Sequence, residues 1–130
     1  TPLLSPKYRL CLVYDEEMAK HRSIFEKEHP ERPERTQKIW ECLSEFGILE
    51  RSFILMSRRA TRQEVERVHC TKHTDFMFGL EKLRDDEILN HQDTYKSVYL
   101  CPSSNDSALL SAGSLLQVFG LYVMNIACIL

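Results

Sequence analysis

The sequence predicts a single α/β domain built around a parallel sheet. Short apolar segments typical of strands alternate with longer segments of helical periodicity. The chain has 130 residues, which is enough for one domain with a modest core. Hydrophobic residues make up 43% and charged residues 28%, as in globular rather than disordered proteins. The net charge of -2 gives no reason to expect a nucleic-acid partner.

The first half of the chain contains two strand candidates with one helix between them. RLCLVY at 9–14 is the first strand candidate, and SFILM at 52–56 is the second. A charged loop over 15–32 leads to Pro33, which suits the first turn of a helix because no N–H is needed there. Gly47 is expected to end that helix.

The second half predicts further helices and a third strand. TRQE at 61–64 matches a capping box, so a helix should begin there, and a second helix should cover 72–83. The stretch 85–93 is polar and loop-like. SVYLC at 97–101 is the third strand candidate, and after a Pro-Ser-Ser break a helix should open near Asp106.

The cysteines exclude two kinds of site. There are five, an odd number, and no Cys-x-x-Cys pair occurs, so neither a zinc ribbon nor a thioredoxin motif is available. Each lies among apolar neighbours, which favours free, buried thiols in a reducing compartment. They are Cys11, Cys42, Cys70, Cys101 and Cys128.

His69 and His73 have a spacing that can hold a metal ion. Four residues apart on a helix, their rings would share one face and could hold a metal ion. A third and a fourth ligand are not evident, so histidines that pack or cap the helix are the favoured interpretation.

Other residue types give no complete active site. The chain has no Gly-rich phosphate loop and no Gly-x-Ser-x-Gly elbow. Ser103 and Ser104 are explained as turn or N-cap residues. Glu31 with Arg35 would form an ordinary surface ion pair worth about 0.2–0.5 kcal/mol.

Three stretches together resemble one family. They are HPERPER at 29–35, VHCTKH at 68–73 and DTYKSVYLCPSSNDSALLSAGSLL at 93–116. In this order and at about this spacing they are similar to the N-terminal part of zinc-dependent histone deacetylase domains of class II. The closest likeness is to the class IIb, tubulin-deacetylase type.

The resemblance implies an arginase/deacetylase fold, in which helices flank a parallel sheet in three αβα layers and the site lies at the carboxyl ends of the strands. This chain would hold a truncated part of that fold. Residues 9–118 would be the N-terminal part of the deacetylase domain, residues 1–8 an extension before it, and residues 119–130 a divergent apolar tail.

The resemblance also suggests roles for two residues. Arg35 matches an arginine that lines the internal channel beneath the zinc, where acetate leaves, and a guanidinium suits that role because it is always charged and binds carboxylates with two N–H groups. The alternative is that Arg35 only pairs with Glu31 on the surface. Ser104 matches the loop position that accepts a hydrogen bond from the substrate's backbone amide, or it is the N-cap of the following helix.

The groups that carry out the family's chemistry are not found in this sequence. In the family two aspartates and a histidine hold zinc, and a Pro-Pro-Gly-His-His segment supplies the general base. This sequence has no His-His and no Asp-x-His. We therefore expect no metal ligands, no catalytic residues and no zinc bound by this chain.

The expected function is that of an N-terminal fragment of a zinc-dependent lysine deacetylase. The full-length family would act on acetylated proteins of the histone or tubulin type, in the cytoplasm, the nucleus or both, without direct nucleic-acid binding.

Two alternatives remain: a non-catalytic isoform that acts as a protein-interaction module, and a membrane-anchored fragment. The uncharged stretch 107–130 is long enough to span a bilayer, but polar residues dilute it and no Lys or Arg follows it, so a buried end is favoured.

Overall fold

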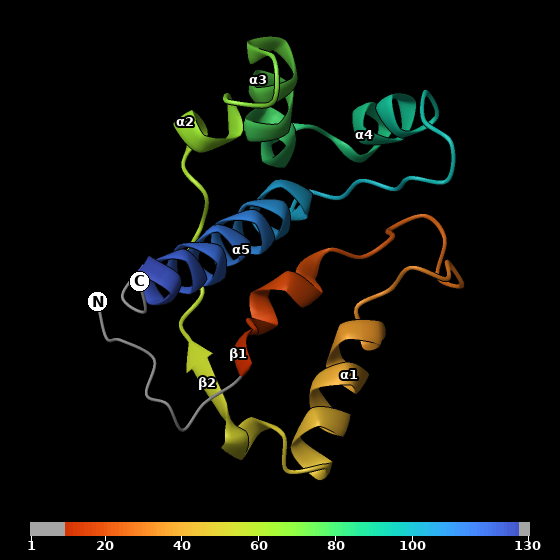
Figure 1. The fold of residues 1–130 in the computed structure, drawn as a ribbon. Helices are drawn as coiled ribbons and strands as arrows, with labels where there is room; N and C mark the ends of the chain where they lie inside the picture. The colour runs from red at the N-terminus through yellow and green to blue at the C-terminus, as the bar shows by residue number, and fades with distance from the viewer. Residues whose placement is uncertain (1–9, 128–130) are drawn as a thin grey trace.

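A small parallel sheet and one long helix organise the chain in the computed structural model, which describes residues 10–127 (Figure 1). The elements in chain order, with η for 3-10 helices, are β1 (Leu10–Val13), η1 (Glu16–Lys20), α1 (Glu34–Glu45), η2 (Leu49–Arg51), β2 (Ser52–Leu55), α2 (Arg62–Val65), α3 (Thr71–Gly79), η3 (Leu80–Lys82), α4 (Asp85–Gln92) and α5 (Ser104–Ala127). Helix α5 runs between the group formed by α2, α3 and α4 and the group formed by α1 and the two strands.

The two predicted strands pair with each other. β1 and β2 are parallel, with Leu10 opposite Ser52 and Val13 opposite Leu55. Parallel strands need a long crossover connection, and here that connection contains α1. On α1, Trp40 stacks on Tyr14 at the end of β1, with 4.7 Å between ring centroids. The prediction of a parallel sheet is therefore confirmed for this pair.

Local signals fix the helix ends. Gly47 follows α1 with a φ of 63°, a conformation that favours glycine. At α2, the Thr61 hydroxyl accepts the Glu64 N–H and the Glu64 carboxylate accepts the Thr61 N–H, which is the predicted capping box. The guanidinium of Arg58 donates to both Glu64 oxygens at 2.8 and 2.9 Å, and this contact, with the Thr61 N–H, lowers the pKa of Glu64 to about 2.

Two predictions for the second half are wrong. Residues 85–92, expected to be a loop, form α4, because the Glu87 carboxylate accepts the N–H of Arg84 at the helix start and Ile88 is fully buried. Residues 97–101 form no strand. The N–H of Leu100 donates instead to the side-chain oxygen of Gln92, 2.9 Å away.

The core lies beneath α3 and α4. Leu80 and Ile88 are fully buried and Leu100 is 7% exposed, with partly buried hydrophobic side chains packed around them. These neighbours are Phe76, Met77 and Leu83. Because Leu100 belongs to the segment that leads into α5, this core holds that segment in place.

The cysteines are less buried than expected. Cys101 is buried and Cys11 is half-buried, but Cys42 and Cys70 are exposed, and all four thiols are free. The prediction of burial is wrong for Cys42 and Cys70, because α1 has no buried residue and Cys70 stands at the start of α3 on the surface. Cys128 lies outside the described residues.

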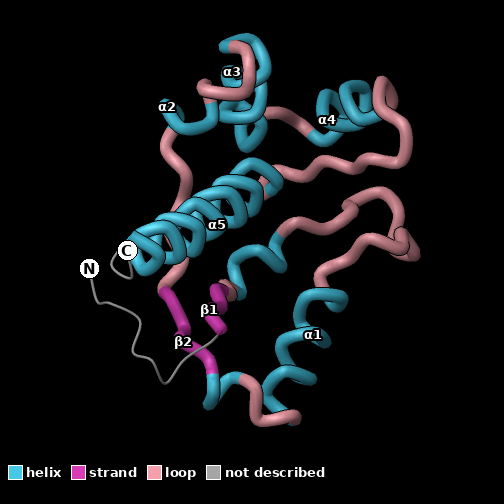
Figure 2. The backbone as a smooth tube through the Cα atoms, in the orientation of Figure 1, coloured by secondary structure: helices cyan, strands magenta, loops and turns pink. Residues whose placement is uncertain are grey.

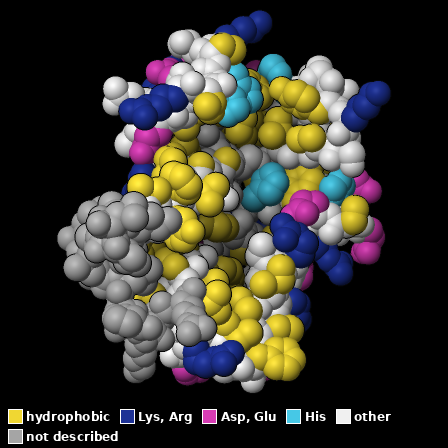
Figure 3. Space-filling model, viewed as in Figure 1, with side chains coloured by type: hydrophobic (Ala, Val, Ile, Leu, Met, Phe, Trp, Pro, Cys, Tyr) yellow, Lys and Arg dark blue, Asp and Glu magenta, His cyan; other side chains and the backbone are white. Residues whose placement is uncertain are grey.

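Helix α5 begins at Ser104, slightly before the predicted start, and continues to Ala127 without a break at residue 118. Its stretch 104–123 is long and apolar enough to cross a membrane by length and composition, although a third of the most apolar window is buried. Several large hydrophobic side chains of α5 are exposed, and Figure 3 shows hydrophobic side chains gathered along this part of the molecule. The boundary proposed at residue 119 stays a prediction, and residues 1–8 lie outside the described part.

Candidate functional site

Two loops that are far apart in the sequence meet the beginning of α5 and line an open cavity. The loop before α1 and the segment before α5 run side by side (Figure 2). The cavity between them has a volume of about 400 Å³. Its lining includes Arg35 from α1, His21 and Tyr99 from the two loops, and Ser104 and Ser107 from the first turn of α5. Arg35 and Ser104, the two residues singled out by resemblance, therefore line one cavity.

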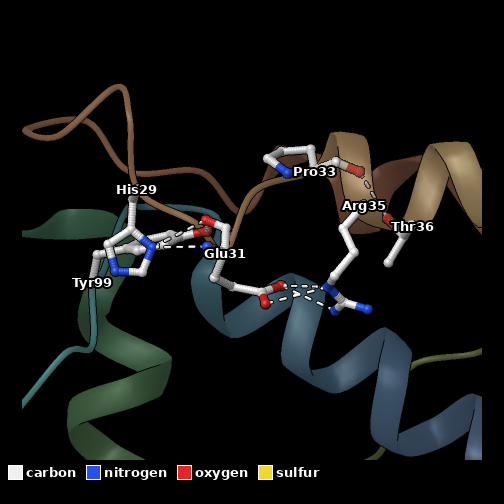
Figure 4. A network of polar contacts seen from close by, with 6 residues as sticks. All are labelled: His29, Glu31, Pro33, Arg35, Thr36 and Tyr99. Atoms are coloured by element: carbon white, nitrogen blue, oxygen red, sulfur yellow. Dashed lines mark hydrogen bonds and ion pairs between the residues drawn. The ribbon is translucent and has the colours of Figure 1, made fainter.

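Arg35 is partly exposed and is bound to a carboxylate. Its guanidinium donates to Glu31 at 3.0 Å, with further contacts from Nε at 3.3 Å (Figure 4). The Arg35 side chain is 54% exposed. This hydrogen bond lowers the pKa of Glu31 and raises the pKa of Arg35. The predicted pair with Glu31 is confirmed, and the channel role of Arg35 stays a prediction.

Tyr99 joins the two loops. The residue is 5% exposed, and its hydroxyl donates to the backbone carbonyl of Glu31, 3.0 Å away. His21 stacks on one face of the ring at 4.5 Å, and His29 meets it edge-on at 4.8 Å. Burial raises the pKa of Tyr99, so the hydroxyl stays protonated and keeps its role as a donor. The loop of the His-Pro motif is thus fixed against the segment before α5.

Ser104 has a buried hydroxyl with three contacts. Its Oγ lies 2.8 Å from Nδ1 of His21, accepts the N–H of Cys101 at 2.8 Å and lies 3.5 Å from the Cys101 sulfur. Ser104 is the first residue of α5, and its hydroxyl binds the preceding segment rather than an N–H of the helix. The role in binding a substrate amide stays a prediction.

Cys101 and His21 are functional candidates that the sequence did not indicate. The thiol is 2% exposed and lies 4.0 Å from Nδ1 of His21. Burial raises the pKa of this thiol, but hydrogen bonds from His21, Ser104 and two backbone N–H groups outweigh burial and lower the pKa to about 7. No local motif joins these residues, because His21 comes from a charged loop early in the chain.

His69 and His73 do not acquire further ligands. Their rings lie 4.9 Å apart, but the expected shared helical face is wrong, because His69 precedes α3 and only His73 lies on that helix. Within residues 10–127 no group of three or more His, Cys, Asp or Glu side chains could hold a metal ion. The donors required for a zinc site are therefore not found in the described part of this chain, and no chemical step is assigned to a metal here.

The model of the histone deacetylase domain matches residues 29–127, which is more than half of the chain. The chain therefore belongs to the histone deacetylase family. The structure also resembles the crystal structure of the HDA15 HD domain, with a TM-score of 0.67 and 29% sequence identity over 81% of this chain. This chain is therefore part of an arginase/deacetylase fold, as predicted, and it corresponds to 29% of that solved chain.

Curated relatives agree with this assignment. Histone deacetylase 5 of Arabidopsis thaliana is 32% identical over 85% of this chain, and histone deacetylase 6 of Caenorhabditis elegans is 31% identical over 75%. Histone deacetylase HDA1 of Saccharomyces cerevisiae is 29% identical over 82% of this chain. The chain spans only 17%, 10% and 18% of these relatives, respectively. The class IIb assignment within the family stays a prediction.

Proposed function

We propose that this chain forms the N-terminal wall of the substrate cavity in a zinc-dependent protein lysine deacetylase. The observation that carries the proposal is that Arg35 and Ser104 line one cavity in a chain of the histone deacetylase family. Hydrolysis of the acetyl-lysine amide would belong to a whole deacetylase domain, with acetylated histone or tubulin as the substrate class. The chain alone would be inactive, and its place in the cell would be the cytoplasm or the nucleus.

Arg35 would bind the carboxylate product. Its guanidinium already donates to both oxygens of Glu31, so the geometry for holding a carboxylate exists. A carboxylate in the cavity would compete with Glu31 for the same donors. Both side chains are about half exposed, so Glu31 can exchange without leaving a buried charge. Ser104 would accept the substrate amide only after its hydroxyl gives up one of its present contacts.

The test uses the HDA15 HD domain as a host. We expect a chimera that carries residues 29–127 of this chain in place of the matching segment to remove acetyl groups from an acetyl-lysine peptide. Because a charge-assisted hydrogen bond is worth about 1.5–3 kcal/mol, Arg35→Ala in the chimera should lower kcat/KM by roughly tenfold to a hundredfold. Arg51→Ala, on η2 outside the cavity, is the matched control and should leave turnover unchanged.

Three outcomes contradict the proposal. One is a folded, zinc-loaded chimera whose turnover does not respond to Arg35→Ala. Another is a folded chimera with no turnover although the unmodified host is active under the same conditions. The third is turnover together with stoichiometric zinc in the isolated chain, which would contradict the inactivity of this chain alone.

A second candidate function is a non-catalytic interaction module, and the exposed face of α5 favours it. Large hydrophobic side chains recur there at helical spacing with exposed fractions of 44–69%. They are Leu115, Leu116, Phe119, Tyr122 and Val123. This face also contributes to an apolar groove of about 290 Å³ with β1. Contiguous exposed apolar surface of this kind is typical of an interface.

The proposed occupant is the rest of a deacetylase domain supplied by another chain. This chain matches only 29% of the solved HDA15 chain, so most of that domain has no counterpart here, which supports this occupant. We expect this chain to co-elute with an HDA15 HD domain that lacks the matching segment, and Phe119→Asp should abolish co-elution. Val68→Asp is the control, because Val68 is also an exposed hydrophobic residue but lies outside α5. This variant should still co-elute. Equal binding by both variants, or flotation with phosphatidylcholine vesicles in place of co-elution, would contradict this function.

A further inference from the structure

Thr61 stands in a basic stretch of the chain that is open to solvent. Arg58 and Arg59 lie three and two residues before it, and no other serine or threonine in the sequence has arginine at both of these positions. Thr61 is exposed, and residues 56–61 form neither helix nor strand. Protein kinases select their substrates by the charges around the acceptor hydroxyl, and two arginines at these positions suit a kinase with an acidic substrate groove.

The space beside Thr61 is large enough for a phosphate group. Thr61 lines a cavity of about 410 Å³ together with Arg59 and Arg62. Its hydroxyl oxygen accepts the N–H of Glu64 at 3.2 Å, which is at the long end of the range for a hydrogen bond. The acceptor hydroxyl is therefore on an exposed residue, next to a cavity and held by a weak contact.

We propose that Thr61 is phosphorylated by a kinase of this kind, with ATP as the phosphoryl donor. The Thr61 oxygen attacks the γ-phosphorus of ATP, the bond from that phosphorus to the bridging oxygen breaks, and ADP leaves. A base of the kinase takes the hydroxyl proton, so the products are phosphothreonine, ADP and a proton. This modification is independent of the proposed deacetylase function.

The phosphate would open the capping box at the start of α2. The Glu64 carboxylate accepts the N–H of Thr61 at 2.7 Å and two N–H groups of Arg58. A phosphate with a charge of about -1.5 to -2 on the Thr61 oxygen repels this carboxylate and competes with it for Arg58. Arg59, which lines the same cavity, would be a second donor and would then leave Asp106 in the first turn of α5. Phosphorylation should therefore loosen the attachment of this segment to α5.

One contact has to open before a kinase can bind the segment. Ala60 is 5% exposed, and its N–H donates to the Leu109 carbonyl at 2.8 Å. The side chains that the kinase would recognise are accessible, since those of Arg58 and Arg59 are 37% and 50% exposed. Because residues 56–61 are a loop, this opening breaks no helix or strand, and such local openings cost far less than global unfolding.

The test compares the folded protein with a peptide of residues 55–65, in which the site is fully accessible. Both are incubated with ATP and the catalytic subunit of the cyclic AMP-dependent protein kinase, which selects arginine at these two positions, and phosphopeptides are quantified by mass spectrometry. We expect the folded protein to be phosphorylated at Thr61 within about tenfold of the peptide's rate. Thr71, which is exposed but has no arginine at these positions, is the internal control and should stay unmodified. A folded protein that reacts more than about tenfold more slowly than the peptide, or equal modification of Thr61 and Thr71, overturns the proposal.

Three variants separate recognition from folding. Thr61→Asn removes the acceptor hydroxyl but keeps a good helix cap, so phosphorylation should be lost while the start of α2 is retained. Thr61→Ser keeps both the cap and a hydroxyl, so it should still be phosphorylated. Arg59→Gln should lower the rate at least about tenfold in the protein and in the peptide alike, because the kinase recognises this charge. The peptide result does not depend on folding, and an unchanged peptide rate would contradict the role of Arg59 in recognition.

Hydrogen exchange measures the consequence of the modification. In the phosphorylated protein the Ala60 amide should exchange at least about tenfold faster than in the unmodified protein, because its segment is released from α5. The amides of β1 should change much less. Unchanged exchange at Ala60 would show that the phosphate leaves the capping box and the crossing segment intact.

Discussion

Replacing Gly113 with alanine is expected to lower the free energy of unfolding by about 1–3 kcal/mol, the usual cost of overpacking. Gly113 lies in α5 where the segment 58–60 crosses the helix. An added Cβ would lie 2.5 Å from the backbone carbon of Arg59 and closer still to the Arg58 oxygen and the Ala60 nitrogen. These atoms belong to the backbone, so the segment itself must move to make room.

The same change at Gly120 is the matched control. Gly120 lies in the same helix and has nothing within 4 Å of its added Cβ. Alanine there should raise the stability by up to about 1 kcal/mol, because alanine has the higher helix propensity. Urea denaturation followed by circular dichroism measures both variants. Equal effects of the two substitutions would show that the crossing at Gly113 is not closely packed.

The effect at Gly113 should extend to the candidate site. The Ala60 N–H donates to the Leu109 carbonyl at 2.8 Å, and Arg59 binds both oxygens of Asp106 at 3.1 Å. Both contacts tie the crossing segment to the first turns of α5. Since Ser104 begins this helix, a displaced segment 58–60 would also disturb the wall of the cavity.

The elements that sequence reasoning predicted well are those with local signals. The capping box at Thr61, the glycine after α1 and the apolar segments of β1 and β2 each depend on neighbouring residues. The physical cause of each feature lies within one or two turns of chain, so the printed sequence contains it. The family resemblance, based on three longer stretches, was also confirmed.

The elements that it missed depend on contacts between distant residues. α4 is polar by composition, and its helix is stabilised by the burial of Ile88 against Leu80 and Leu100. The segment 97–101 has strand-like residues, but a strand needs a partner, and Leu100 bonds to Gln92 instead. Composition alone contains neither fact.

The candidate site follows the same division. The pair of Glu31 and Arg35 is four residues apart and was predicted. Arg35 and Ser104 were singled out only by the resemblance, and the fold shows that both line one cavity. The contact between His21 and Cys101 joins two loops that are 80 residues apart in the sequence. One sequence without its fold offers no signal for such a contact.

Replacing Ile88 with alanine is the second large change, with an expected loss of about 2–5 kcal/mol in the free energy of unfolding. Ile88 is fully buried, and truncation would leave a cavity between α4, Leu80 and Leu100. Leu115→Ala, on a side chain that is 69% exposed, is the control and should cost less than about 0.5 kcal/mol. Chemical denaturation of the purified variants gives both values.

Leu100 lies between Tyr99 and Cys101. The Ile88→Ala substitution should therefore loosen the candidate site as well as the core. Leu100 is held from one side by Ile88 and through its N–H by Gln92, both on α4. Weakening this support should increase hydrogen exchange of the Tyr99–Cys101 amides more than that of β1 or β2, which contact other elements. If exchange rose equally across the described chain, α4 would stabilise the fold as a whole and would have no special part in positioning the cavity wall.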